Sequence, residues 1–113
     1  MRNFELSYMV SQCSSLLEVK KNQLKVGDHI ILKTYNSTYK IMVDTDGKYI
    51  VSGGWFDKNN MSPLKTTING CTWGGSVIKT DIVAACGLFL EFGNRLKTSR
   101  IKEIFIFPMP CQN

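Results

Sequence analysis

The sequence predicts an α+β protein, with an N-terminal amphipathic helix followed by an antiparallel sheet of about six short strands. Two observations predict this fold. Apolar residues recur at helical spacing in the first segment and then at a period of two beyond it. Gly- and Asn-containing turns separate the later apolar runs. A chain of 113 residues fits a single domain. We therefore expect a helix within residues 1–22 and a β-rich body over residues 26–107, curled as a small barrel or packed as a sandwich.

The expected helix lies in the stretch "NFELSYMVSQCSSLLEVKK". Asn3 can cap its start, and Lys20 and Lys21 suit the negative end of the helix dipole. The spacing places one apolar stripe on this helix, and the sheet is expected to cover that stripe. The stripe consists of Leu6, Met9, Val10, Cys13, Leu16 and Leu17.

Three strands are expected in the first half of the body, in "VGDHIILKT", "STYKIMV" and "KYIVSGG". Asp46-Gly47 separates the second from the third and is typical of a hairpin turn, because both residues tolerate positive φ. A two-residue turn would place Val43 opposite Ile50. A longer turn would shift the register and exchange the faces, and the sequence leaves both registers open.

The second half begins with an Asn-rich loop over residues 57–65, followed by a strand in "TTINGCTW" with a bulge at Gly70. Residues 81–86 fit either a short helix or a strand. We expect a strand over residues 88–92, a Gly93–Asn94 turn and a last strand within residues 99–107. Pro108 and Pro110 end that strand, because proline cannot donate to a sheet.

Composition narrows the classes of protein. The net charge of +5 favours acidic partners, but a charge of this size also keeps small domains soluble. The longest apolar run, residues 82–90, is too short to cross a bilayer, and the N-terminus is a poor signal peptide. A cytoplasmic location without membrane contact is the expectation. The four cysteines include no C-x-x-C pair and there is one histidine, so we expect no metal, no cofactor and reduced thiols.

A set of short motifs in a fixed order resembles a group of small bacterial β-rich proteins without an assigned activity. The motifs are "TYNSTY", "VSGGWF", "GCTWGGS", "LEFGN" and "TSRI", and the resemblance spans residues 26 to about 106. The resemblance implies a compact, β-rich, intracellular bacterial protein, and it implies no mechanism.

Two mirrored stretches, "SGGWF" and "TWGGS", place a glycine pair beside each tryptophan. One interpretation is a small-molecule pocket at Gly53, Gly54, Gly74 and Gly75. The favoured one is that the glycines let strands bend or bulge while Trp55 and Trp73 pack inward, because the spacing is not that of a phosphate-binding loop.

Catalysis has little support in the sequence. His29 could meet Cys71 or Cys86, but nothing nearby would activate either thiol. The aspartates occur at turns, where they bond to backbone amides. Glu91 is expected to pair with Arg95 or Arg100. No catalytic residue is assigned, and the sequence favours a binding domain over an enzyme.

Three functions remain, in this order. The first is protein interaction or self-association, as a homo-oligomer, because the hairpins are apolar on both faces. The second is nucleic-acid binding, with phosphates held by a basic segment and bases stacked on indoles. The third is the small-molecule site at the paired glycines. The nucleic-acid hypothesis assigns Arg95, Lys97, Arg100, Lys102, Trp55 and Trp73.

Overall fold

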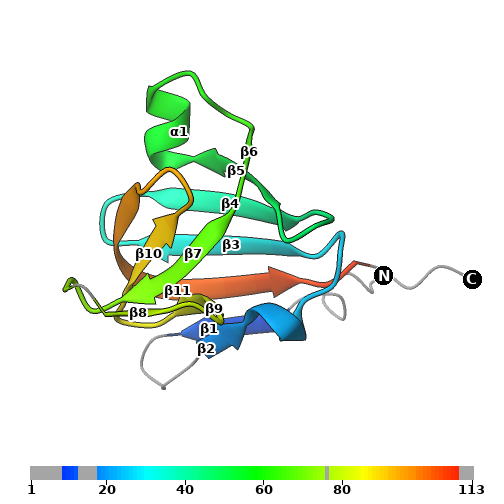
Figure 1. Cartoon of the computed structure of the whole chain (residues 1–113), viewed down its shortest axis with the longest axis horizontal. Coiled ribbons are helices and arrows are strands. Elements are labelled where there is room, and N and C mark those ends of the chain that lie inside the picture. Colours follow the sequence, from blue (N-terminus) through cyan, green and yellow to red (C-terminus); the bar gives the residue numbers. More distant parts are fainter. Residues whose placement is uncertain (1–8, 13–17, 76, 110–113) are drawn as a thin grey trace, which may run out of the picture.

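The structure is a computed structural model that describes residues 9–12, 18–75 and 77–109, with residues 9–12 described as backbone only. Nearly all the secondary structure in these ranges is β (Figure 1). The strands of the main sheet are β1 (Met9–Gln12), β3 (His29–Thr34), β4 (Thr38–Val43), β5 (Tyr49–Gly53), β6 (Leu64–Thr66), β7 (Ile68–Thr72), β8 (Ile78–Lys79), β10 (Phe89–Phe92) and β11 (Lys97–Phe107). A second sheet pairs β2 (Glu18–Lys20) with β9 (Ile82–Ala85).

The main sheet has the order β6-β5-β4-β3-β11-β10-β7-β8, and β1 also pairs with β11. One edge of β11 pairs with β3. Its other edge is divided, because its first residues pair with β10 and Glu103–Ile106 pair with β1. The sheet therefore turns at β11, and β10 and β7 run steeply across the direction of β3 and β4 (Figure 1). The end strands β6 and β8 do not pair with each other, so the expected barrel is not closed.

The expected N-terminal helix is wrong, and so is the α+β class. Residues 9–12 and 18–20 lie inside the expected helix, yet they form β1 and β2. Residues 1–8 and 13–17 lie outside the described part of the chain. Both strands complete antiparallel ladders, β1 on β11 and β2 on β9. Pairing with distant strands can override the helical spacing of apolar residues, because it satisfies the hydrogen bonds of backbone N–H and C=O groups. The spacing of apolar residues does not reveal such pairing.

The helical structure that the described residues do contain is short. Helix α1 (Gly54–Lys58) follows β5, and the 3-10 turn η2 (Lys21–Gln23) follows β2. None of the helices in the described ranges is long and apolar enough to cross a membrane.

Alternating residues of the main sheet form the core. Ile30 and Leu32 of β3, Ile41 of β4 and Ile104 of β11 are fully buried on the inner face. The second sheet closes this core, because all four residues of β9 are buried and β9 packs against β7, β10 and β11. Residues 81–86, which fitted either a helix or a strand, therefore contain a strand.

The β4–β5 hairpin has the longer of the two turns that the sequence left open. Val43 lies opposite Tyr49, and Ile41 lies opposite Val51, so these four residues share the inner face. Asp46 and Gly47 adopt φ values of 60° and 70°, as an Asp-Gly turn requires.

The later strands follow the expectation closely. β10 covers Phe89–Phe92, and β11 begins slightly earlier than expected, at Lys97. A bulge occurs beside Gly70, because Glu91 pairs with Gly70 while Phe92 pairs with Ile68. The carboxylate of Asp28 accepts backbone hydrogen bonds from Lys25 and Met109, which is the turn role expected of it.

Candidate binding surface

The first glycine pair lets helix α1 lie directly on β4. Gly53 has a φ of 93°, and a Cβ atom there would come within 2.3 Å of the Thr38 carbonyl oxygen. A Cβ atom on Gly54 would come within 2.5 Å of the Tyr39 ring. The Trp55 N–H donates to the Tyr39 hydroxyl at 3.4 Å across this contact. These glycines are thus in contact with the protein's own backbone and ring.

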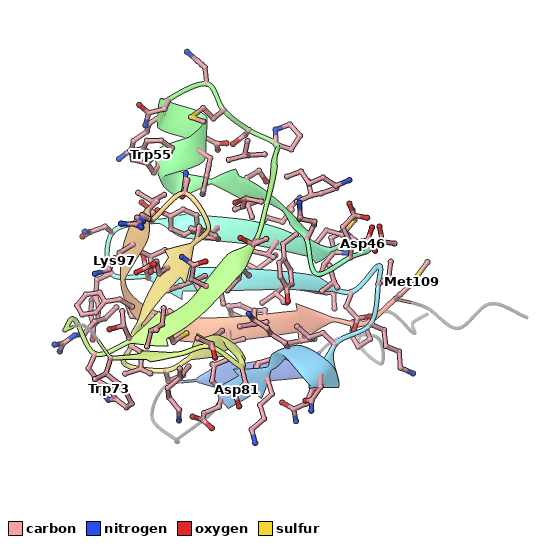
Figure 2. All side chains as sticks on the ribbon, viewed as in Figure 1. Asp46, Trp55, Trp73, Asp81, Lys97 and Met109 are labelled. Atoms are coloured by element: carbon pink, nitrogen blue, oxygen red, sulfur yellow. The ribbon has the colours of Figure 1, made fainter. Side chains whose placement is uncertain are left out.

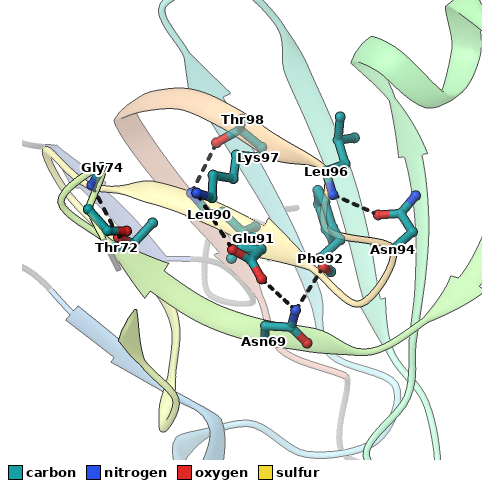
Figure 3. Close-up of polar contacts among 11 residues, drawn as sticks. Asn69, Thr72, Gly74, Leu90, Glu91, Phe92, Asn94, Leu96, Lys97 and Thr98 are labelled. Atoms are coloured by element: carbon teal, nitrogen blue, oxygen red, sulfur yellow. Dashed lines mark hydrogen bonds and ion pairs between the residues drawn. The ribbon is translucent and has the colours of Figure 1, made fainter. Parts of the chain in front are cut away.

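The second pair forms the turn after β7. The Gly74 N–H donates to Thr72 Oγ1 at 3.1 Å, and that hydroxyl donates to the Gly75 carbonyl at 3.3 Å. Figure 3 shows the Thr72–Gly74 bond. This turn lies at the lower left of Figure 1, whereas α1 lies at the top. The structure does not bring the two glycine pairs together.

The two tryptophans differ in their burial. Trp55 is half-buried against the core and packs edge-to-face on Phe56, as expected. Trp73 is 57% exposed, so the expectation that both indoles pack inward is wrong for Trp73. Lys79 Nζ lies 5.9 Å from the Trp73 ring. A large ring that stands in solvent beside a cation is available for stacking.

Two cations of β11 lie over aromatic rings. The Arg100 guanidinium is 5.3 Å from the Phe89 ring, and Lys102 Nζ is 5.4 Å from the Tyr35 ring. Ile101 between them is buried, so Arg100 and Lys102 project together from the opposite face, as the alternation predicted. Tyr35 is 70% exposed.

Lys97 belongs to a polar network that links the β10–β11 hairpin to Asn69 of β7 (Figure 3). Its Nζ lies 4.0 Å from Glu91, and the other carboxylate oxygen of Glu91 accepts a bond of 2.7 Å from the Asn69 amide. The expected partner of Glu91 was Arg95 or Arg100, and Lys97 takes that role. Arg95 is exposed in the β10–β11 turn, where its φ is 69°.

The turn between β3 and β4 joins these groups into one surface. The Tyr35 N–H donates to the Arg100 carbonyl at 3.1 Å, and the Asn36 N–H donates to Ser99 Oγ at 3.0 Å. We call the result the basic-aromatic surface. It consists of Tyr35, Trp55, Lys58, Phe89, Arg95, Lys97, Arg100 and Lys102.

A cavity of about 220 Å³ opens in this surface between α1 and the start of β11. Trp55 and Tyr39 supply its rings, and Lys58 and Lys97 supply its cations. Figure 2 shows Trp55 and Lys97 toward the same side of the molecule. Sequence reasoning missed Lys58. The one available signal was that Lys58 follows Trp55 by three residues, which places both on one helical face, but that segment was expected to be a loop.

The described cysteines offer no reactive thiol. Burial raises the pKa of Cys71 to about 12, and its Sγ donates to the Val83 carbonyl at 3.7 Å. Cys86 is disulfide-bonded, which differs from the expected reduced thiol. His29 is exposed at the first residue of β3. Within the described ranges, no three His, Cys, Asp or Glu residues are grouped so that they could hold a metal ion.

The assignment of a function depends on this surface chemistry, because no protein-family model, curated protein or solved structure matches the chain.

Proposed function

We propose that the protein binds single-stranded nucleic acid through the basic-aromatic surface. The observation that carries the proposal is the pairing of Arg100 with Phe89 and of Lys102 with Tyr35, beside the cavity at Trp55. Proteins that bind single strands combine cations for the phosphates with exposed rings for the bases. Here both groups lie on adjoining segments of one surface.

The charges on this surface are largely uncompensated. Lys58, Arg95, Arg100 and Lys102 form no ion pair in the described part of the chain, and Lys97 meets Glu91 only at 4.0 Å. Such a cluster attracts a polyanion and gains free energy by releasing its counterions. The overall charge of +5 acts in the same direction.

The size of the cavity suits one part of a longer ligand. Its volume of about 220 Å³ lies below the roughly 300–1,000 Å³ of pockets that enclose a separate small molecule. The cations on both sides of it favour a base that is held between flanking phosphates. The small-molecule site that the sequence placed at the glycine pairs has less support, because those pairs lie apart and Gly53 and Gly54 are in contact with β4.

The test is fluorescence anisotropy with a labelled oligothymidine at two salt concentrations. We expect the double variant Arg100→Gln/Lys102→Gln to bind at least about tenfold more weakly. Its plot of log affinity against log salt should be shallower by about 1.4, since each single-strand phosphate contact contributes about 0.7. Tyr35→Ala should weaken binding, whereas Tyr35→Phe, which keeps the exposed ring, should largely preserve it.

The matched control is Lys25→Gln/Lys48→Gln, which removes the same charge from exposed residues outside the surface. Equal losses in the two double variants would mean that only net charge matters. That result, or binding that does not respond to salt, would contradict the proposal.

A second candidate function, self-association, is favoured by the outer face of the main sheet. Ile31 lies beside Phe105, and Met42 lies beside Ile50, and all four side chains are only half-buried. Two half-buried apolar pairs on one face can contact another copy of the chain. Sedimentation across a concentration series should then show an oligomer that Ile31→Lys dissociates. A strict monomer at every concentration would exclude this role.

A further inference from the structure

A second and larger cavity lies away from the basic-aromatic surface. Its volume is about 450 Å³, within the range of sites for small organic molecules. It opens between the segment at η2 and the β4–β5 turn. Figure 2 places that turn, at Asp46, on the side opposite Lys97. Leu24, Val26 and Val43 supply its apolar wall.

The hydroxyl of Tyr49 has no partner in this cavity. Tyr49 is only 5% exposed and lines the cavity, and no described residue forms a hydrogen bond with its hydroxyl. Its burial also raises the pKa of this hydroxyl. Buried polar groups nearly always have a partner, so an unsatisfied hydroxyl that borders an open volume marks a position for a ligand atom.

Lys21 supplies a second donor to the same cavity. Its half-buried side chain crosses to β7, where Nζ donates to the Ile68 carbonyl at 2.8 Å. Burial lowers the pKa of this amine, and Asp81 and Cys71 oppose that effect. An ammonium group has three N–H donors, and Ile68 accepts from one of them.

The acidic groups at the cavity are already compensated or lie at its exposed edge. Asp44 accepts a hydrogen bond from the Thr45 amide and pairs with Lys65 at 3.1 Å. Asp46 stands exposed at the tip of the turn, close to Lys48 in the chain. The Tyr49 hydroxyl and the two remaining N–H groups of Lys21 Nζ can still donate hydrogen bonds.

We propose that this cavity binds a small organic anion, a carboxylate with a short apolar body. The carboxylate accepts hydrogen bonds from the Tyr49 hydroxyl and from Lys21 Nζ, while the apolar body packs on Leu24, Val26 and Val43. A carboxylate can accept several hydrogen bonds at once, and bonds with a charged partner are the stronger kind. This site is separate from the proposed nucleic-acid surface and does not depend on it.

The experiment compares hexanoate, 1-hexanol and hexylamine by amide chemical-shift titration of the ¹⁵N-labelled protein. We expect hexanoate to give saturable shifts confined to residues 21–26 and 43–49. Hexanol, which keeps the apolar body without the charge, should bind at least about tenfold more weakly, a difference of roughly 1.4 kcal/mol. Hexylamine should not bind.

Two variants remove one donor each. Tyr49→Phe and Lys21→Met should each weaken hexanoate binding by about tenfold. Tyr49→Phe is expected to fold, because the hydroxyl that it removes has no hydrogen bond within the described ranges. Tyr35→Phe and Lys25→Met, at residues that do not line the cavity, should leave binding unchanged.

Equal affinity for hexanoate and hexanol would overturn the proposal, because the donors would then have no part in recognition. It would also be overturned by an absence of saturable shifts up to the solubility limit. Shifts centred on the basic-aromatic surface would place the anion elsewhere and count against it equally.

Discussion

Gly53 sets the position of helix α1 through its missing side chain. Its φ of 93° is a conformation that other residues rarely adopt, and the Thr38 carbonyl fills the space where a Cβ atom would lie. Trp55, two residues later, forms one wall of the cavity in the basic-aromatic surface. The backbone conformation of one residue therefore determines where an aromatic ring of the candidate site stands.

Gly53→Ala should lower the free energy of unfolding by about 2–4 kcal/mol, because it combines backbone strain with a steric clash. Urea denaturation followed by tryptophan fluorescence measures this change. Gly75→Ala is the matched control, since Gly75 has an ordinary φ and a Cβ atom there meets nothing within 4 Å. Similar stabilities for the two variants would show that Gly53 is not under steric constraint.

Among the elements, α1 and its following loop depend on one carboxylate. Asp57 accepts hydrogen bonds from the Ser62 hydroxyl and from the Gly53 N–H, the latter at 3.0 Å. These two bonds lower the pKa of Asp57. The Asp57 carboxylate thus links the start of α1 to the loop that follows it, and protonation at low pH removes the charge of this acceptor.

The pH dependence follows from the sign of this shift. A folded-state pKa below the unfolded value means that Asp57 stabilises the fold fully above the unfolded pKa of about 4. That contribution is lost as the pH falls through the lowered folded-state pKa. Asp57→Asn should therefore show a shallower loss of melting temperature on acidification than the unmodified protein. Asp46→Asn, at an exposed turn, is the control, and an equal effect there would contradict the role of Asp57.

The sequence predicted most of the strands. It also predicted an N-terminal helix where β1 and β2 lie, and it did not predict helix α1. The body strands were predictable because alternating burial and turn residues are local features, as at Ile30–Leu32 and Asp46-Gly47. The N-terminal segment was not, because its pairing depends on β11 and β9, which are distant in the sequence. Helix α1 has five residues, too few for a periodic signal, and begins with glycine.

The candidate site was likewise predictable only in part. That Arg100 and Lys102 share one face followed from strand alternation alone. The position of Arg100 over Phe89 depends on the register of the β10–β11 hairpin. The contact of Lys102 with Tyr35, and the meeting of Trp55 with Lys97, depend on how β11 packs against the β3–β4 turn and α1. The cavity at Tyr49 was not predictable, because η2 was expected to belong to a helix and its approach to the β4–β5 turn has no local signature.

In the whole molecule, β11 connects three parts of the main sheet. Ile104 on this strand is fully buried, and β11 borders β1, β3 and β10. A smaller side chain at Ile104 would therefore weaken packing at the point where the sheet turns. The surrounding core is rigid and would close the resulting cavity only in part.

Ile104→Ala should lower the free energy of unfolding by about 2–5 kcal/mol, the usual range for a buried isoleucine. Chemical denaturation measures the loss. Ile31→Ala on the outer face makes the same deletion at a half-buried site and should cost clearly less. If the two substitutions cost the same, β11 would not have the central role described here.

The thiol of Cys71 lies between the two sheets, with its proton held by a pKa of about 12. Alkylating reagents attack the thiolate, so this sulfur stays inert while β7 and β9 remain packed together. A local opening that separates the two sheets would expose the Cys71 thiol to solvent and restore its ordinary reactivity. The rate at which Cys71 becomes alkylated would therefore report how often the two sheets separate.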